Sequence, residues 1–191
     1  RGGQGAKTAS RILGTAAFLS GYQAQDSPIY GAERRGAPVA AFTRFGREPI
    51  RERGVIAHPD LVVVADASLL EDPAARVSDG ITEQTILFIN SPLHAEQIRA
   101  PSALCGRITT LGVTEIALQH FGQREAISAL LGAVAARLSG LQQEPLRQAI
   151  EQELGNLGVA PPIIERNQTV ALTCYESVQV MERESVAESA T

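Results

Sequence analysis

Three short apolar runs constrain the fold of this chain more than any other feature. They occupy residues 61–65 (LVVVA), 85–90 (TILFIN) and 108–111 (ITTL). Strands that are apolar throughout are typical of a parallel sheet covered on both faces, so the first run is expected in the middle of such a sheet. The intervening segments are long enough for crossover helices. This alternation predicts an α/β fold of three layers, Rossmann-like, with a mostly parallel sheet and helices on both faces.

Apolar residues at helical spacing predict five helices around that sheet. A sixth, capped by Ser68, is expected to run toward Val77, and residues 39–45 (VAAFTRF) form a further strand candidate. The glycine-rich start of the first helix normally follows a strand, so a first strand is expected to have preceded Arg1. Residues 1–181 are predicted to form one domain with a helical C-terminal arm, and the charged residues 182–191 a frayed tail. The five helices are expected at residues 4–21, 114–121, 124–139, 145–154 and 163–180.

Charge and cysteine content exclude several classes of protein. With 17 basic and 21 acidic residues the net charge is −4, which disfavours a strongly basic nucleic-acid binder. Two cysteines cannot build a disulfide framework or supply four ligands to an iron–sulfur cluster. No apolar run reaches the roughly 18–20 residues of a membrane span, and no signal peptide is visible. A soluble, cytoplasmic protein is expected.

The chain begins with a glycine loop that could bind a phosphate. Gly2, Gly3, Gln4 and Gly5 precede the first helix, with Lys7 in its first turn. Glycines let backbone amides approach an anion, and a helix N-terminus adds free N–H donors and partial positive charge. The loop matches neither the P-loop pattern, because Ala6 precedes Lys7, nor G-x-G-x-x-G, because Thr8 replaces the third glycine. Anion binding and a simple tight turn are equally supported.

A second candidate segment covers residues 25–38 and is dense in proline, glycine and charge, so it is predicted to be a long loop. Arg34 and Arg35 could hold a carboxylate or phosphate in bidentate fashion, or pair with Glu33 or Asp26. We favour contact with a partner subunit, because arginine and tyrosine are enriched at interfaces, and we expect the isolated chain to self-associate. The expected interface residues of this loop are Asp26, Ser27, Pro28, Tyr30, Glu33 and Gly36.

The remaining candidates carry weaker signals. Three histidines, His58, His94 and His120, lack metal-ligand spacing and are expected on the surface or in loops. Cys105 and Cys174 are predicted to be buried thiols rather than nucleophiles. Asp66 follows a strand, where α/β sheets place ligands, but capping of the next helix is favoured. The same ambiguity applies to Asn90 and Ser91.

The glycine loop and the arginine segment together resemble a known family. Residues 1–5 (RGGQG), 25–28 (QDSP) and 31–39 (GAERRGAPV) are similar to the gamma subunit or gamma domain of 2-oxoacid:ferredoxin oxidoreductases, which include pyruvate:ferredoxin oxidoreductase. The strand before Asp66, the pair Asn90 and Ser91, and Asn167 in the last helix also lie where such a domain would place them. The resemblance therefore covers most of the chain.

This resemblance implies a component that is active only when assembled. Such enzymes decarboxylate a 2-oxoacid, here pyruvate or 2-oxoglutarate, on thiamine diphosphate held by alpha and beta subunits. A ferredoxin-like subunit carries the iron–sulfur clusters, ferredoxin accepts the electrons, and coenzyme A takes the acyl group. For the gamma component the resemblance implies a structural role in assembly. It also allows the component to form part of the coenzyme A site, for which the candidate residues are 2–5, Lys7, Arg34 and Arg35. A free-standing Rossmann-type nucleotide-binding module and a purely structural interaction domain remain the alternatives.

Overall fold

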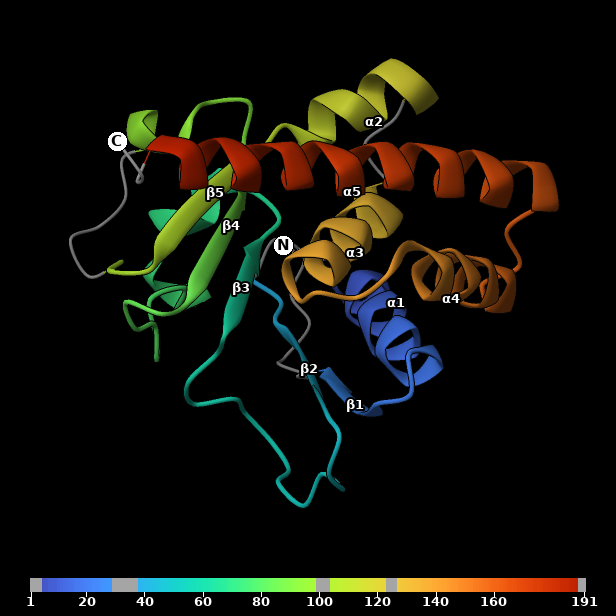
Figure 1. Ribbon diagram of the computed structural model, residues 1–191, viewed down its shortest axis with the longest axis horizontal. Helices are drawn as coiled ribbons and strands as arrows, with labels where there is room; N and C mark the ends of the chain where they lie inside the picture. Colours follow the sequence, from blue (N-terminus) through green and yellow to red (C-terminus); the bar gives the residue numbers. More distant parts are fainter. Residues whose placement is uncertain (1–4, 29–37, 99–103, 123–126, 189–191) are drawn as a thin grey trace.

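A parallel sheet forms one half of the protein (Figure 1), which is described by a computed structural model for residues 5–28, 38–98, 104–122 and 127–188. Strand β4 (Ile86–Asn90) lies between β3 (Leu61–Val64) and β5 (Arg107–Leu111), and both pairings are parallel. The α/β class and the parallel sheet are therefore confirmed. The expected middle position of the first apolar run is wrong, because β4 is the central strand of the described sheet and β3 lies at its edge.

The two faces of the sheet are covered differently. On one face Phe88 joins the main core formed with the α-helices. On the other, Leu87 and Ile89 pack with Leu69 and Leu70 of a short 3₁₀ helix, η1 (Ala67–Leu70). The predicted helix from Ser68 toward Val77 is thus replaced by η1 and a second 3₁₀ turn, η2 (Pro73–Ala75). Pro73 lacks the N–H that a continuing helix needs, and Asp72 caps the new turn by accepting from the amide of Ala74 at 2.9 Å.

An antiparallel ribbon stands apart from this sheet. Strand β1 (Gln23–Pro28) pairs with β2 (Ala41–Gly46), with Gln23 opposite Gly46 and Pro28 opposite Ala41. The prediction of a strand near residues 39–45 is confirmed, but residues 25–28 are strand rather than loop. Their sequence (QDSP) lacks the β-branched and aromatic residues that signal a strand, so this pairing depends on tertiary contact.

Helix α1 (Ala6–Leu19) connects the ribbon to the helical core. It packs against both strands of the ribbon, against α3 (Ile127–Leu138) and against α4 (Gln143–Asn156). The approach to α3 is close, because a Cβ added at Gly132 would lie 2.9 Å from Cγ2 of Ile12. Ile12 is fully buried at this contact.

The predicted helical C-terminal region is confirmed as helix α5 (Pro161–Glu188), which runs along α3 and contributes to the core (Figure 1). Its inward face buries Ala171 and Cys174, and the hydroxyl of Tyr175 donates to the carbonyl of Leu141 at 2.7 Å. The helix extends beyond the predicted end at residue 180, so the segment expected to fray begins within it. The remaining predicted helix is α2 (Val113–Phe121). No helix within the described ranges is long and apolar enough to span a membrane.

The glycine contact between α1 and α3 gives a stability test. Gly132→Val forces a branched side chain into Ile12 and is expected to lower the free energy of unfolding by about 1–3 kcal/mol. The matched control is Gly155→Ala in α4, where an added Cβ meets no atom within 4 Å and where alanine gains roughly 0.5–1 kcal/mol of helix stability. Urea unfolding followed by circular dichroism measures both, and equal stability of the two variants would contradict the packing described.

Candidate functional site

Part of the glycine loop can be placed. Gly5 caps α1 in a left-handed conformation with φ 71°, which favours glycine. A Cβ at Gly5 would lie 2.7 Å from the Cβ of Ser128, so this position also lacks space for a side chain. Lys7 lies half-buried in the first turn of α1. Gly2, Gly3 and Gln4 lie outside the described residues. At Gly5 a glycine is needed for structural reasons, namely its backbone conformation and its close contact with Ser128.

The predicted interface segment is divided in the same way. Asp26, Ser27 and Pro28 belong to β1, with Asp26 exposed. The predicted site residues Tyr30, Glu33, Arg34, Arg35 and Gly36 lie outside the described residues.

The ribbon is tied to α1 by polar contacts in the middle of the helix. The hydroxyls of Ser10 and Thr43 are 2.7 Å apart, and the Thr43 hydroxyl also lies 3.1 Å from the Ser10 carbonyl oxygen, to which it donates. A Cβ added at Gly14 would meet Cγ2 of Thr43 at 3.7 Å and Cβ of Asp26 at 4.0 Å. These contacts fix the face of the ribbon that meets α1.

They also fix the direction of β1 relative to α1. The chain turns back after α1 and enters β1 at Gln23, and Asp26 has reached the level of Gly14. Strand β1 therefore runs back toward the start of α1. The paired residues Pro28 and Ala41 form the end of the ribbon on the same side as Gly5.

A buried carboxylate that the sequence did not indicate anchors α1 to α4. Glu153 is 5% exposed. Its Oε1 accepts from the hydroxyl of Thr15 at 2.7 Å, and its Oε2 forms an ion pair with Arg11 at 2.9 Å. The predicted helix at residues 145–154 contained this glutamate with no signal for its partners, which lie about 140 residues earlier in the chain.

The polar residues after the parallel strands are used in structural hydrogen bonds. The side-chain amide of Asn90 donates to the carbonyl of Ala65 at 2.9 Å and to the hydroxyl of Thr114 at 2.8 Å, and its oxygen accepts from the Thr114 amide at 3.2 Å. Asn90 thereby joins the end of β3 to the start of α2. The favoured capping role of Asp66 is confirmed, since its carboxylate accepts from the Ser68 amide at 3.0 Å.

Two further candidates have local structural roles. The hydroxyl of Ser91 accepts from the amide of Leu93 at 3.2 Å. The buried Asn167 donates to the carbonyl of Ile163, one turn earlier in α5, at 2.8 Å. Both side chains therefore form hydrogen bonds with the backbone of their own segment.

The three histidines and the two cysteines differ in their exposure to solvent. His58, His94 and His120 are exposed, as predicted. Cys174 is buried, as predicted, and burial raises its pKa to about 12. Cys105 is exposed, so its predicted burial is wrong. It precedes β5, and its thiol donates to the carbonyl of Ile81 at 3.7 Å.

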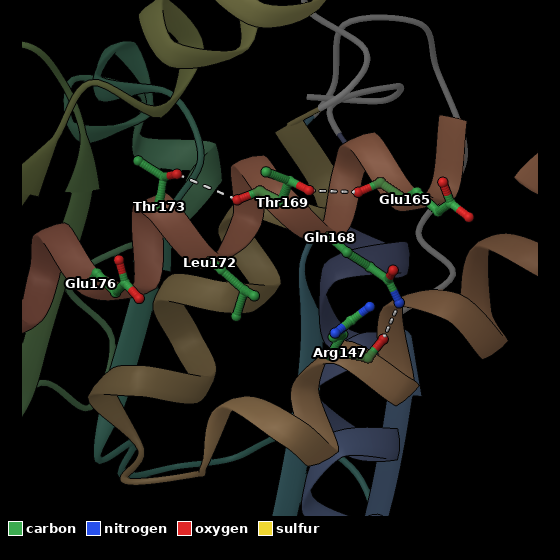
Figure 2. Close-up of a pocket in the computed structure, with 7 residues that line it drawn as sticks. All are labelled: Arg147, Glu165, Gln168, Thr169, Leu172, Thr173 and Glu176. Atoms are coloured by element: carbon green, nitrogen blue, oxygen red, sulfur yellow. Dashed lines mark hydrogen bonds between the residues drawn. The ribbon is translucent and has the colours of Figure 1, made fainter. Parts of the chain in front are cut away.

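A shallow groove lies between α4 and α5 (Figure 2). It has a volume of about 420 Å³. The hydroxyls of Thr169 and Thr173 donate to carbonyls four residues earlier in α5, and Gln168 donates to the carbonyl of Arg147 at 2.8 Å. The side chains of Gln168, Thr169 and Thr173 therefore bond to backbone carbonyls of the two helices, and none of the sequence-predicted site residues lines the groove. The lining residues are Arg147, Glu165, Gln168, Thr169, Leu172, Thr173 and Glu176.

The side chains do not fit a resident iron–sulfur cluster. Such a cluster takes four cysteine ligands, and this chain has one exposed and one buried cysteine. Within the part of the chain that the structure describes, no group of three or more histidine, cysteine, aspartate or glutamate residues is placed to hold a metal ion.

These elements define the protein as an α/β domain whose parallel sheet is covered by α-helices on one face and by 3₁₀ helices on the other. Residues 1–177 match the family model described as pyruvate ferredoxin/flavodoxin oxidoreductase, and the chain belongs to this family. The resemblance identified from residues 1–5 and 31–39 is thereby confirmed.

Related proteins align with this chain over nearly its full length. The pyruvate/ketoisovalerate oxidoreductases common subunit gamma of Pyrococcus furiosus is 39% identical, with 95% of each chain covered. The pyruvate synthase subunit PorC of Thermotoga maritima is 37% identical, with 95% of this chain and 93% of the relative covered. The crystal structure of the pyruvate oxidoreductase subunit from Thermotoga maritima superposes with a TM-score of 0.76 at 32% identity, over 92% of this chain and 91% of that one. These homologues are subunits of multi-subunit enzymes.

The contrast between the two cysteines can be measured directly. At pH 8 the Cys174 thiol is protonated and enclosed, whereas Cys105 is accessible. We expect iodoacetamide to label one cysteine, identified as Cys105 by peptide mass, in the native protein, and both cysteines in guanidinium chloride. Native labelling of Cys174 at a rate within tenfold of Cys105 would contradict this burial.

The role of Asn90 is also testable. Asn90→Ala leaves the Ala65 carbonyl and the Thr114 amide without their partner and is expected to lower the free energy of unfolding by about 2–4 kcal/mol. Thr114→Ser keeps the hydroxyl that Asn90 contacts, so its stability should remain within roughly 1 kcal/mol of the parent protein. Thermal unfolding of both variants separates this bonding role from a ligand-binding role, which would leave stability unchanged.

Proposed function

We propose that this chain is the gamma component of an oxidoreductase that decarboxylates pyruvate oxidatively and passes the electrons to ferredoxin. The observation that carries the proposal is the match over residues 1–177, together with relatives more than 35% identical along almost their whole length that are named as such subunits.

The proposed division of labour is the one that the resemblance to 2-oxoacid:ferredoxin oxidoreductases implies. Thiamine diphosphate, held by the alpha and beta subunits, supplies the stabilisation of the carbanion formed on decarboxylation. The same resemblance assigns the iron–sulfur clusters to a ferredoxin-like subunit, and the two cysteines of this chain are too few to ligate a cluster. The gamma component contributes a rigid α/β body and exposed surfaces to the cytoplasmic assembly.

A share in the coenzyme A site is the finer part of the proposal. Coenzyme A carries three phosphate groups, and the amides of residues 2–5 precede the positive end of α1. The ribbon end formed by Pro28 and Ala41 lies on the same side as Gly5, which supports an approach of Arg34 and Arg35 to the glycine loop. Arginine is suited to bidentate binding of phosphate.

Reconstitution tests the main proposal. The full chain is produced together with the thiamine-binding and ferredoxin-like subunits of its source, and pyruvate-dependent reduction of a viologen dye is measured with and without it. We expect activity that requires this chain, thiamine diphosphate and coenzyme A, with 2-oxoglutarate as the comparison substrate. A chain that neither joins the other subunits nor changes their activity, but binds a nucleotide alone, would support the free-standing module instead.

The coenzyme A contact has its own test. In the assembled enzyme, Gln4→Ala and Arg34→Ala are expected to raise the KM for coenzyme A roughly 10-fold or more while the KM for pyruvate stays constant, because each removes a hydrogen bond to a charged ligand. Arg107→Ala removes an equal charge at the exposed start of β5 and serves as the control. An unchanged KM in both variants, with no calorimetric binding of coenzyme A by the chain, would show that this site lies on other subunits.

A further inference from the structure

We propose that residues 47–56, here called the docking loop, bind a neighbouring subunit of the oxidoreductase at a surface where carboxylates surround an apolar recess. This inference rests on the proposed function, since it presumes that the chain works within an assembly. It concerns a segment distinct from the glycine loop and from residues 25–38.

The docking loop belongs to a long connection without secondary structure. The chain leaves β2 after Gly46 and enters β3 at Leu61, with no helix or strand between them. In Figure 1 this connection extends below the strands and away from the α-helices. Residues 51–55 are all exposed. Connections of this length without structure are uncommon in compact domains unless they have a function.

One guanidinium group holds the loop in shape. Arg44, on β2, donates to the carbonyl of Gly54 and to the carbonyl of Val55, both at 3.0 Å. Its Nε also lies 3.9 Å from a carboxylate oxygen of Glu52. The Arg44 side chain is only 17% exposed, so the loop covers it. A segment anchored in this way is ordered before it binds, which lowers the entropic cost of association.

The base of the connection is anchored separately. The hydroxyl of Thr85 donates to the carbonyl of Pro59 at 2.9 Å. Gly80 approaches so closely that an added Cβ would lie 1.7 Å from the carbonyl oxygen of Ala57. The return to β3 is therefore fixed to the sheet, while residues 47–56 extend beyond these anchors.

The exposed side chains of the loop indicate the chemistry of its partner. Val55 is 63% exposed beside the clamp formed by Arg44. Arg51 and Arg53 are exposed, and no ion pair within the described part of the chain engages either one. An apolar side chain flanked by guanidinium groups fits an apolar recess bordered by carboxylates, and arginine is enriched among the residues that dominate binding energy.

A second copy of this chain is a poorer partner for the same surface. The docking loop carries three arginines, Arg47, Arg51 and Arg53, against two glutamates, Glu48 and Glu52, so two loops facing each other would bring together segments of the same net sign. A different subunit with an acidic surface has no such penalty.

Assembly with the partner subunits tests the inference. The double variant Arg51→Glu, Arg53→Glu and the variant Val55→Asp are each expected to raise the dissociation constant of the complex about 30-fold or more, measured by sedimentation velocity. Turnover with pyruvate per assembled complex should stay within roughly twofold of the parent complex, because the proposed role of the loop is subunit binding rather than contact with the substrate. The backbone amides of residues 47–56 should gain protection from hydrogen exchange on assembly.

Controls separate this inference from a general loss of solubility or charge. Leu157→Asp changes an apolar residue of similar exposure, 56%, after α4, and Arg147→Glu reverses a charge on α4, so both should assemble as the parent protein does. Arg44→Lys removes the two-point clamp and is expected to weaken assembly while native circular dichroism is retained.

The outcomes distinguish the two proposals. If the parent chain does not join the thiamine-binding and ferredoxin-like subunits, the proposed function fails. If it joins them and the loop variants assemble equally well, with no change in exchange at residues 47–56, the docking loop is disproved while the function stands. Loss of self-association alone, with assembly intact, would assign the loop to contacts between copies and also overturn the inference.

Discussion

The close approach of α1 to α3 is the contact on which the arrangement of the exposed segments depends. Gly132 of α3 lets Ile12 of α1 reach the α3 backbone. Gly5, at the start of α1, lies against Ser128 in the first turn of α3. The ribbon reaches the rest of the molecule through α1, by the bonds between Ser10 and Thr43. A shift of α1 would therefore move the glycine loop and both ends of the ribbon together.

The buried polar residues support this rigidity rather than chemistry. Asn90 joins β3 to α2, Glu153 joins α1 to α4, and Tyr175 fixes α5 to the turn at Leu141. Each of these hydrogen bonds links elements far apart in sequence, where an unpaired polar group would be costly. The side chains of Asn90, Glu153 and Tyr175 are therefore engaged within the fold itself.

The features that sequence could predict are those with local signals. Apolar runs located β3, β4 and β5 nearly to the residue, and helical periodicity located the α-helices, because burial on one or both faces leaves a periodic pattern. Strand β1 was not predicted, because its sequence, QAQDSP, has polar residues at most positions. Its strand conformation depends on contacts with β2 and α1. The crossover helices were expected from segment length alone, whereas Pro73 and the caps at Asp66 and Asp72 favour short 3₁₀ turns.

The candidate site was predictable in part for the same reason. Glycines at a helix start and clustered arginines are visible in sequence, but Arg44 acquires its role only when β2 places it beneath residues 54 and 55. Likewise the exposure of Cys105 depends on how the chain enters β5, which no local pattern specifies.

The ribbon gives the two proposed recognition surfaces a common support. Its antiparallel register puts Pro28 and Ala41 at the end near the start of α1, and Gln23 and Gly46 at the opposite end, from which the docking loop continues. Both strands rest on α1, so the same helix supports the docking loop and follows the glycine loop. The two proposed surfaces therefore lie at opposite ends of one ribbon of six paired residues and share α1 as their support.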